Sequence, residues 1–294
     1  MTNLQNNLKG KFRENVDLSK TTWFQVGGKA RTLYRPYDEA DLRNFLEENK
    51  SPIAPLGACS NIIIRDGGID GTVIKLGQKF THIDINDNLV TIGAGCLDYN
   101  AAHQTAKLGL SGLEFLSTIP GTIGGAIAMN AGCYGSETSD FLHSCKAVRI
   151  KDGKSFNFLR KDVPFSYRAN ELSPEFIFVN ATFNLSKKPI LEIQSQIKEL
   201  IRSREESQPT KQKTGGSTFK NPYKQKAWEL IDRCNLRGYR VGGAEISQKH
   251  CNFIINTGDA SASDIENLGE YIIKTVYEKT GIKLEWEIKR IGQR

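Results

Sequence analysis

The sequence predicts an α+β fold, in which strands and helices do not alternate as regular βαβ units. Short apolar runs separated by glycine-rich turns recur through the first 186 residues, as is typical of strands. Two longer segments after residue 186 carry apolar residues at helical spacing. No period of about 20–50 residues recurs, so a solenoid or a propeller is excluded.

The composition is that of an ordinary globular protein, with 294 residues, 38% hydrophobic and 25% charged, and this length allows two or three domains. The polar stretch Met1–Val16 contains no apolar segment of the signal-peptide kind, and no later run approaches the roughly 20 apolar residues of a membrane span. We therefore expect a cytoplasmic protein without membrane insertion. The six cysteines have no C-x-x-C spacing, which indicates neither disulfides nor a metal site.

The net charge of +7 is concentrated in residues 202–249, which contain 11 Lys or Arg and 5 Asp or Glu. This segment contains no recognisable nucleic-acid recognition module, so we expect no nucleic acid partner. Two explanations of this excess of basic residues stay open, namely a concave surface that binds a small phosphorylated substrate and a simple solvated face.

In the first region we expect a strand at Thr32–Arg35, a helix at Asp38–Asn49, and strands at Ile53–Leu56, Ile62–Ile64 and Thr72–Leu76. Because small residues let backbone amides approach a ligand, the loop between two of these strands is a candidate anion site. That loop is Gly57-Ala58-Cys59-Ser60-Asn61.

In the second region a strand at Leu89–Gly95 precedes a helix at Leu97–Lys107. Gly93-Ala94-Gly95 is similar to the start of a dinucleotide fingerprint, but Asp98 stands where the third glycine is required, so an NAD-type Rossmann interpretation is weak. A hairpin around Asp152-Gly153 and a long strand at Phe176–Leu185 follow.

In the third region, which begins near Ser186, one helix is expected through Ile190–Ile201. A second helix is expected to begin at a capping box formed by Ser263 and Glu266 and to stop at Gly281. We expect both helices to face a separate small core.

The most informative segment is Pro120–Gly135, where five glycines lie among apolar residues rather than among the polar residues of a linker. Backbone amides of such a loop can converge on an anion such as a diphosphate. A buried, tightly turning loop without a ligand explains the pattern equally well, and both interpretations stay open.

The sequence contains three further groups of polar residues that packing alone does not require. The Arg168 guanidinium, between predicted strands, suits a substrate carboxylate, although an isolated surface arginine is the commoner case. Thr214–Pro222 presents a hydroxyl, an ammonium group and an amide around two glycines. Leu284–Ile288 is predicted to be a terminal strand with Glu285 and Glu287 on its polar face.

The ordered set of these segments resembles the UDP-N-acetylenolpyruvoylglucosamine reductase family of flavoenzymes, nearly from end to end. Any one match could arise by chance, but their joint order makes the resemblance specific. The segments that carry it are Thr21–Gly28, Leu56–Asn61, Ile119–Gly135, Ser166–Arg168, Gly215–Pro222, Gly242–Ala244, Lys249–Ile254 and Leu284–Gly292.

The resemblance implies a two-part FAD-binding fold of the PCMH/vanillyl-alcohol-oxidase type and a smaller α+β substrate-binding domain. The implied FAD-binding subdomains are residues 1–76 and residues 77–186, with residues 286–294 returning to the second, and residues 187–285 form the substrate-binding domain. The residues implied to border FAD are Gly57, Ala58, Cys59, Ser60, Asn61, Gly121, Thr122, Gly124, Gly125 and Ala126.

The resemblance further implies an enzyme of peptidoglycan precursor synthesis that reduces UDP-N-acetylglucosamine enolpyruvate to UDP-N-acetylmuramate with NADPH as electron donor. Flavin N5 would deliver a hydride to C3, and Ser217 would deliver a proton to C2. Arg168 would pair with the developing negative charge, and a protonated Glu287 would lie beside it. Lys220 and Asn221 are the implied substrate contacts.

Two positions depart from the family pattern, since Cys59 replaces a usual glycine and Ala227-Trp228 replaces a usual small pair. No insertion with a substrate-capping tyrosine is seen, so the shorter subtype is expected, and we also expect a monomer. Two alternatives stay open, namely a flavin oxidase or dehydrogenase of the same fold with another substrate, and a nucleotide-sugar binding protein without redox activity.

Overall fold

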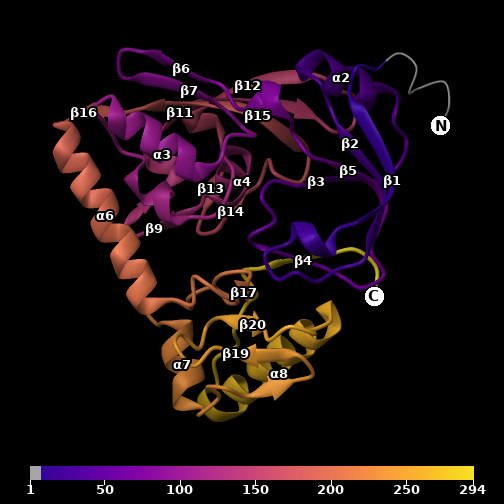
Figure 1. The fold of residues 1–294 in the computed structure, drawn as a ribbon, viewed down its shortest axis with the longest axis vertical. Coiled ribbons are helices and arrows are strands. Elements are labelled where there is room, and N and C mark those ends of the chain that lie inside the picture. The colour runs from indigo at the N-terminus through magenta and orange to yellow at the C-terminus, as the bar shows by residue number, and fades with distance from the viewer. Residues whose placement is uncertain (1–7) are drawn as a thin grey trace. The chain divides into compact units, whose positions relative to one another are not determined.

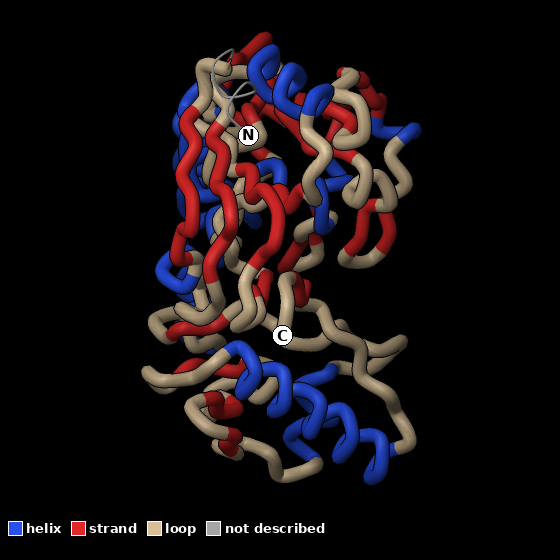
Figure 2. Tube along the Cα trace, turned by 90° about the vertical axis from the view of Figure 1, so that its right-hand side faces the viewer, coloured by secondary structure: helices blue, strands red, loops and turns tan. Residues whose placement is uncertain are grey.

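The computed structural model describes residues 8–294, so the beginning of the polar N-terminal stretch lies outside the described part. The chain divides into two compact units. Helices and strands both occur along the chain (Figure 2), in agreement with the predicted α+β class. Unit 1 comprises residues 8–14, Thr32–Ala58 and Gly71–Ser203, and unit 2 comprises Asn15–Arg31, Cys59–Asp70 and Arg204–Arg294. The domain boundaries implied by the resemblance remain a prediction.

The helix expected in the first region is present as α2 (Glu39–Glu48). Asp38 caps it, because its carboxylate accepts a hydrogen bond from the backbone N of Asp41 at 2.9 Å. The strands of this region form a four-stranded sheet in the order β1 (Lys11–Asp17), β2 (Lys29–Arg35), β5 (Ile69–Ile74) and β3 (Ile53–Pro55).

Unit 1 contains a five-stranded sheet whose neighbouring strands are all antiparallel. The predicted hairpin around Asp152-Gly153 and the predicted long strand are both part of it. In sheet order its strands are β12 (Ser155–Leu159), β11 (Leu142–Arg149), β15 (Phe176–Asn184), β7 (Leu89–Gly93) and β6 (Ile83–Asn86) (Figure 1).

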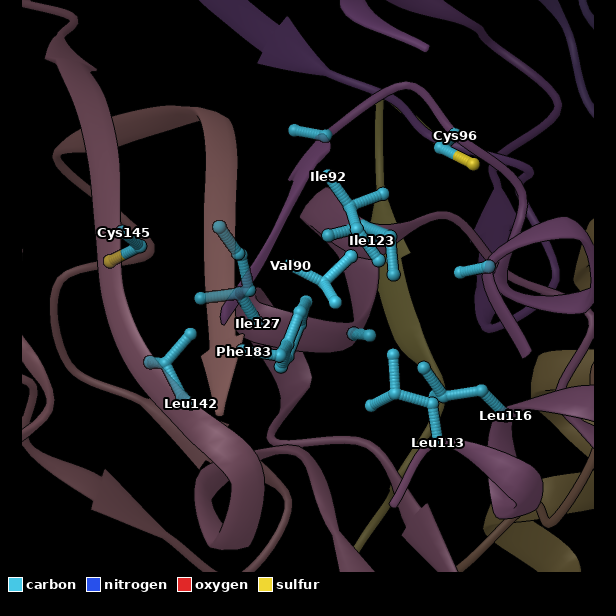
Figure 3. Close-up of a cluster of buried hydrophobic side chains, with 14 of the residues drawn as sticks. Val90, Ile92, Cys96, Leu113, Leu116, Ile123, Ile127, Leu142, Cys145 and Phe183 are labelled. Carbon is cyan, nitrogen blue, oxygen red and sulfur yellow. The ribbon is translucent and has the colours of Figure 1, made fainter. Parts of the chain in front are cut away.

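Two helices pack with this sheet to form the main core of unit 1. They are α3 (Asp98–Lys107), which confirms the predicted helix, and α4 (Ile123–Met129). Figure 3 shows Ile123 and Ile127 of α4 among the strand residues Val90 and Phe183, all of which are fully buried.

The segment expected to be a glycine loop is therefore partly helical. Thr122 is the N-cap of α4, and its hydroxyl oxygen accepts a hydrogen bond from the backbone N of Gly125 at 3.3 Å. Glycine is unfavourable within a helix, but here the apolar face of Ile123 and Ile127 is buried in the core, and this burial outweighs the helix propensity. Asn130, in the left-handed conformation, ends the helix.

Shorter elements complete unit 1. The chain forms the pair β8 (Leu110–Ser111) and β16 (Ser186–Lys187), the pair β9 (Gly132–Cys133) and β10 (Ser136–Glu137), and the pair β13 (Phe165–Ser166) and β14 (Ala169–Asn170). It also forms helix α5 (Thr138–Phe141) and 3-10 turns at Gln78–Phe80, Glu114–Thr118 and Arg160–Asp162. A further 3-10 turn at Ser19–Thr21 belongs to unit 2.

The expected helix after residue 186 is α6 (Ile190–Ser207). Its buried residues Ile193 and Ile197 pack against Ala106 of α3. The expectation that α6 and the last helix face one common small core is therefore wrong, since Ile193 and Ile197 pack with Ala106 while the buried residues of the last helix belong to a different cluster.

Unit 2 is built around α8 (Ala262–Thr280) and α7 (Ala227–Arg233), and α8 contributes Ile265, Leu268 and Ile272 to its core. Its antiparallel sheet has the order β17 (Lys213–Thr214), β20 (Ile254–Asn256), β19 (Ala244–Ile246) and β18 (Arg240–Val241). A parallel pair joins β4 (Ile62–Ile64) and β21 (Lys289–Ile291).

The structure corrects the start of α8. Its N-cap is Ser261, which forms the capping box with Asp264, while the predicted Ser263 bonds to the Asp66 carboxylate at 2.6 Å. The predicted partner Glu266 pairs with the Arg65 guanidinium at 3.0 Å. A helix with several polar residues before its apolar face offers more than one cap, and the tertiary partners select among them. Gly281 ends α8 in the left-handed conformation, as predicted.

The terminal strand is also displaced from its predicted position. Leu284 and Ile288 are buried and Glu285 is exposed, as the alternation predicts, but within the described residues this segment forms an isolated bridge between Trp286 and Phe219 rather than a regular strand. The regular strand β21 begins immediately afterwards, where the chain meets β4.

Candidate active site

A cavity of about 320 Å³ lies within unit 1. Its walls come from the ends of β3 and β5, the turn after β7, α4 with its N-cap, and the start of β15. Half of the ten residues implied to border FAD line this cavity. They are Gly57, Ala58, Thr122, Gly124 and Gly125.

The two small-residue loops of unit 1 meet in this wall. A Cβ atom on Gly57 would lie 2.5 Å from Oγ1 of Thr122, and one on Gly124 would lie 3.1 Å from the Cβ and carbonyl oxygen of Ala94. The amide of Gly124 donates to the Ala94 carbonyl at 2.9 Å, and that of Gly121 donates to the Ile119 carbonyl at 3.0 Å. These two amides therefore have carbonyl partners within the protein, as in a tightly turning loop, and Gly124 provides room for close packing.

Gly121 and Ala126 do not line the cavity. Ala126 is buried in the core, and a Cβ on Gly121 would lie 2.2 Å from Oδ2 of Asp98. Asp98 is itself fully buried, and neither of its carboxylate oxygens has a hydrogen-bond partner within residues 8–294. Burial raises the pKa of the Asp98 carboxyl well above its usual range, so an uncharged side chain is favoured behind the loop.

The remaining implied FAD residues, Cys59, Ser60 and Asn61, belong to unit 2. Cys59 has φ +57°, in the left-handed region that favours glycine, and this accounts for the glycine that the resemblance expects there. Asn61 contacts the C-terminal segment, because its Nδ2 donates to the Glu287 carbonyl at 3.3 Å and its own carbonyl accepts from the Lys289 N at 3.1 Å.

Arg168 lies in unit 1, in the turn between β13 and β14, with φ +56°. Its Nη2 donates to the Gly132 carbonyl at 2.6 Å. On the next strand, Nδ2 of Asn170 donates to the Ile127 carbonyl of α4 at 3.1 Å. The Arg168 turn is thus attached to the segment around α4, a helix that also lines the cavity.

Ser217 and Glu287 lie in unit 2, and the structure brings their segments together. The Glu287 N donates to the Thr218 carbonyl at 2.9 Å, and the Lys220 N donates to the Glu285 carbonyl at 2.9 Å. Both Ser217 and Glu287 are half-buried. A hydroxyl and a carboxyl from distant parts of the sequence therefore lie on neighbouring backbones.

The two implied substrate contacts follow directly on this segment. Lys220 is half-buried and Asn221 is exposed. Oδ1 of Asn221 accepts a hydrogen bond from the Ala227 N at 3.0 Å, so this side chain also caps α7.

Sequence reasoning missed part of the cavity wall, notably Gly95 and Phe178. The Gly93-Ala94-Gly95 motif is the sequence signal for Gly95, but its similarity to a Rossmann fingerprint does not indicate this cavity. Phe178 has no sequence signal apart from its place in a strand. Within the described residues, no cluster of three or more side chains suits a metal ion and no helix is long and apolar enough to cross a membrane.

Comparisons with known proteins agree with this architecture. The family profile described as UDP-N-acetylenolpyruvoylglucosamine reductase, C-terminal domain, matches residues 208–291, and that of an FAD binding domain matches residues 31–158. UDP-N-acetylenolpyruvoylglucosamine reductases of Rickettsia massiliae (strain Mtu5) and Rickettsia prowazekii (strain Madrid E) are 48% and 47% identical to this chain over 288 residues, with 97% of each chain covered.

A solved structure gives the same result. The crystal structure of UDP-N-acetylenolpyruvylglucosamine reductase from Thermus caldophilus matches with a TM-score of 0.84 and 34% identity, covering 97% of this chain and 100% of that chain. The predicted α+β class with an FAD-binding fold is confirmed. The chain belongs to the UDP-N-acetylenolpyruvoylglucosamine reductase family and is an FAD-dependent oxidoreductase.

Proposed function

We propose that this chain reduces UDP-N-acetylglucosamine enolpyruvate to UDP-N-acetylmuramate, with NADPH as electron donor, in peptidoglycan precursor synthesis. FAD, when bound and reduced by NADPH, supplies the hydride that C3 of the enolpyruvyl group accepts. The cavity of unit 1 supports the cofactor assignment, because its wall combines close-packed glycines with the N-cap of α4. Gly57, Ala58, Thr122, Gly124 and Gly125 would hold the cofactor there.

Ser217 is the proposed proton donor to C2. A serine hydroxyl is a weak acid, so this role requires a strongly basic carbon and close positioning. The observation that carries the proposal is the pairing of the Ser217 and Glu287 segments through the bonds at Thr218 and Lys220. The Lys220 ammonium would add positive potential beside the donor.

Arg168 is proposed to pair with the substrate carboxylate, where negative charge develops during reduction. Glu287 is proposed to be protonated beside the same group, since two neighbouring carboxylates disfavour a second negative charge. Lys220 and Asn221 are proposed to contact the nucleotide sugar. Cys59, Ser60, Asn61, Gly121 and Ala126 are proposed to complete the surroundings of FAD, the last two from behind the cavity wall.

The test is an anaerobic two-step experiment on the purified holoenzyme. NADPH is added first and flavin reduction is followed by absorbance, and then the enolpyruvyl nucleotide sugar is added and flavin reoxidation is followed. The proposal expects rapid reoxidation and formation of UDP-N-acetylmuramate. A yellow protein that NADPH reduces but the enolpyruvyl sugar does not reoxidise favours a flavin oxidase or dehydrogenase with another substrate.

Ser217→Ala tests the proton donor. We expect flavin reduction by NADPH at the wild-type rate and reoxidation by the enolpyruvyl sugar slowed by about 10²–10⁴-fold, because general acid catalysis is lost. Ser207→Ala, at the exposed end of α6, is the control and is expected to leave both steps unchanged. Product formation at the wild-type rate in Ser217→Ala would remove Ser217 from this role.

We also propose that the reaction takes place in the cytoplasm, where NADPH and nucleotide sugars are made, and that it supports cell-wall growth, shape and division. A monomer is proposed for the active form. Light scattering of the holoenzyme at micromolar concentration tests this, and a mass twice that of the 32.8 kDa chain would contradict it.

A further inference from the structure

Asn252 pairs with the backbone that immediately follows Ser217. The Phe219 N donates to Oδ1 of Asn252 at 3.0 Å, and Nδ2 of Asn252 donates to the Phe219 carbonyl at 2.9 Å. In addition, the Thr218 N donates to the Asn252 carbonyl at 2.7 Å. Asn252 is 4% exposed, so water does not compete for these bonds.

On the other side of Ser217 the chain contains two glycines. Gly216 has φ +82°, and a Cβ atom there would meet nothing within 4 Å, whereas one on Gly215 would lie 2.4 Å from the Phe24 ring. The Asn252 side chain restrains the backbone on the Thr218 and Phe219 side of Ser217.

One of these two residues also pairs with the Glu287 backbone. The Thr218 carbonyl accepts a hydrogen bond from the Glu287 N at 2.9 Å. A shift of the Thr218–Phe219 backbone would therefore move Ser217 and change its relation to Glu287 together. Displacements of about 1 Å at a reacting group can lower a rate by about 100-fold.

We propose that Asn252 is a positioning residue that fixes the Ser217 hydroxyl for proton delivery, an inference that rests on the proposed function of Ser217. Its side-chain amide has a donor nitrogen and an acceptor oxygen, which match the carbonyl and the N–H of Phe219. Aspartate at this position keeps the shape and the acceptor but loses the donor, and it brings a carboxylate oxygen toward the Phe219 carbonyl. If Asn252 only stabilised the fold, its substitution would affect flavin reduction and flavin reoxidation alike. If it positions Ser217, its substitution slows flavin reoxidation selectively.

The first test compares Asn252→Asp with wild type in the anaerobic two-step experiment. We expect flavin reduction by NADPH to stay within about twofold, and flavin reoxidation by the enolpyruvyl sugar to slow by about 10–100-fold. Asn252→Gln, which keeps both amide functions one methylene further out, is expected to slow reoxidation less than Asn252→Asp. It also serves as the test variant if Asn252→Asp does not yield folded holoenzyme.

The control is Asn256→Asp. Asn256 is another buried asparagine of unit 2, at the end of β20, and its Nδ2 donates to the Phe24 carbonyl at 2.8 Å. Its side chain bonds to none of the residues from Ser217 to Phe219 in the described part of the chain. It is expected to lower Tm as Asn252→Asp does, while the ratio of the two half-reaction rates stays at the wild-type value.

The second test is a double-mutant cycle. If Asn252 acts through Ser217, Asn252→Asp in the Ser217→Ala background is expected to slow reoxidation by less than about twofold further. The inference is overturned if the two effects multiply, or if Asn252→Asp slows both half-reactions equally. If instead Ser217→Ala alone reoxidises at the wild-type rate, the proposed function of Ser217 fails first, so the two failures are distinguishable.

Discussion

At the scale of single residues, Cys59 is one of several residues with a side chain whose backbone lies in the left-handed region. Its φ of +57° costs a residue with a side chain about 1–2 kcal/mol relative to glycine. The side chain is buried, so the thiol contributes packing that opposes part of this cost. The departure from the family pattern therefore has a physical cost at this position, in a loop proposed to border FAD.

Two substitutions separate the strain from the packing. Because alanine and glycine both lack the thiol, the difference between Cys59→Ala and Cys59→Gly reports mainly the backbone conformation. We expect Cys59→Gly to be more stable than Cys59→Ala by about 1 kcal/mol. Urea unfolding of both variants measures this difference, and equal stabilities would mean that the loop relaxes out of the left-handed region in solution.

At Asp98, burial disfavours the charged carboxylate that an aspartate usually carries in water. Since burial raises the pKa of its carboxyl in the folded protein, the folded state holds the proton at pH values where the unfolded state has released it. Stability is therefore lost as the pH rises from about 4, the ordinary value for the unfolded chain, toward the folded pKa.

Asp98→Asn tests this linkage. The amide keeps the shape but has no charge to lose, so we expect a higher Tm than wild type at pH 7 and a difference that shrinks as the pH falls toward 4. Thermal unfolding of both proteins between pH 4 and pH 8 is the measurement. Parallel curves over that range would contradict a raised pKa at Asp98.

At the scale of elements, the start of α8 shows how several side chains share the capping of one helix. Ser261 accepts from the Asp264 N at 3.0 Å, while the Asp66 carboxylate accepts from the N atoms of Ala262 and Ser263, both at 2.9 Å. Asp66 comes from a distant part of the sequence, so half of this cap is tertiary. Local sequence alone suggests Ser263 as the cap, because the neighbouring residues give no sign that the distant Asp66 accepts hydrogen bonds from this turn.

Ser261→Ala is expected to lower the free energy of unfolding by about 0.5–2 kcal/mol, because an N-cap acceptor is lost. Ser263→Ala is the matched control and is expected to cost less, since Asp66 still accepts from the backbone of that turn. Urea unfolding ranks the two variants, and the reverse order would restore Ser263 as the N-cap.

At the scale of the whole molecule, unit 2 is assembled from three separate stretches of the chain, Asn15–Arg31, Cys59–Asp70 and Arg204–Arg294. Its core includes Phe24 and Ile63 beside Leu268. The parallel pairing of β4 with β21 connects the loop of Asn61 to the segment of Glu287. Residues proposed for the cofactor and for proton transfer are thus joined within one unit by the return of the C-terminal segment.

Much of this could be predicted from the sequence. The residue patterns identified α2, α3, α6 and several strands, among them β5, β7 and β15, because apolar periodicity and turn residues are local properties. The ordered motifs identified the family, and with it the FAD-binding fold. They also nominated Ser217 and Glu287, whose segments the structure brings together.

Other features depended on tertiary structure. α4 forms despite its glycines because Ile123 and Ile127 are buried in the core, and Gly124 is required because Ala94 lies against it. The bonds from Asn252 to Phe219 join two segments that have no local relation in the sequence. Periodicity, capping and motif order are properties of neighbouring residues, so the sequence by itself determined the elements and the family. Close packing and hydrogen bonds between distant segments exist only after the chain folds, so the tertiary structure alone decided the cavity wall, the contribution of Asp66 to the cap of α8 and the support of Ser217.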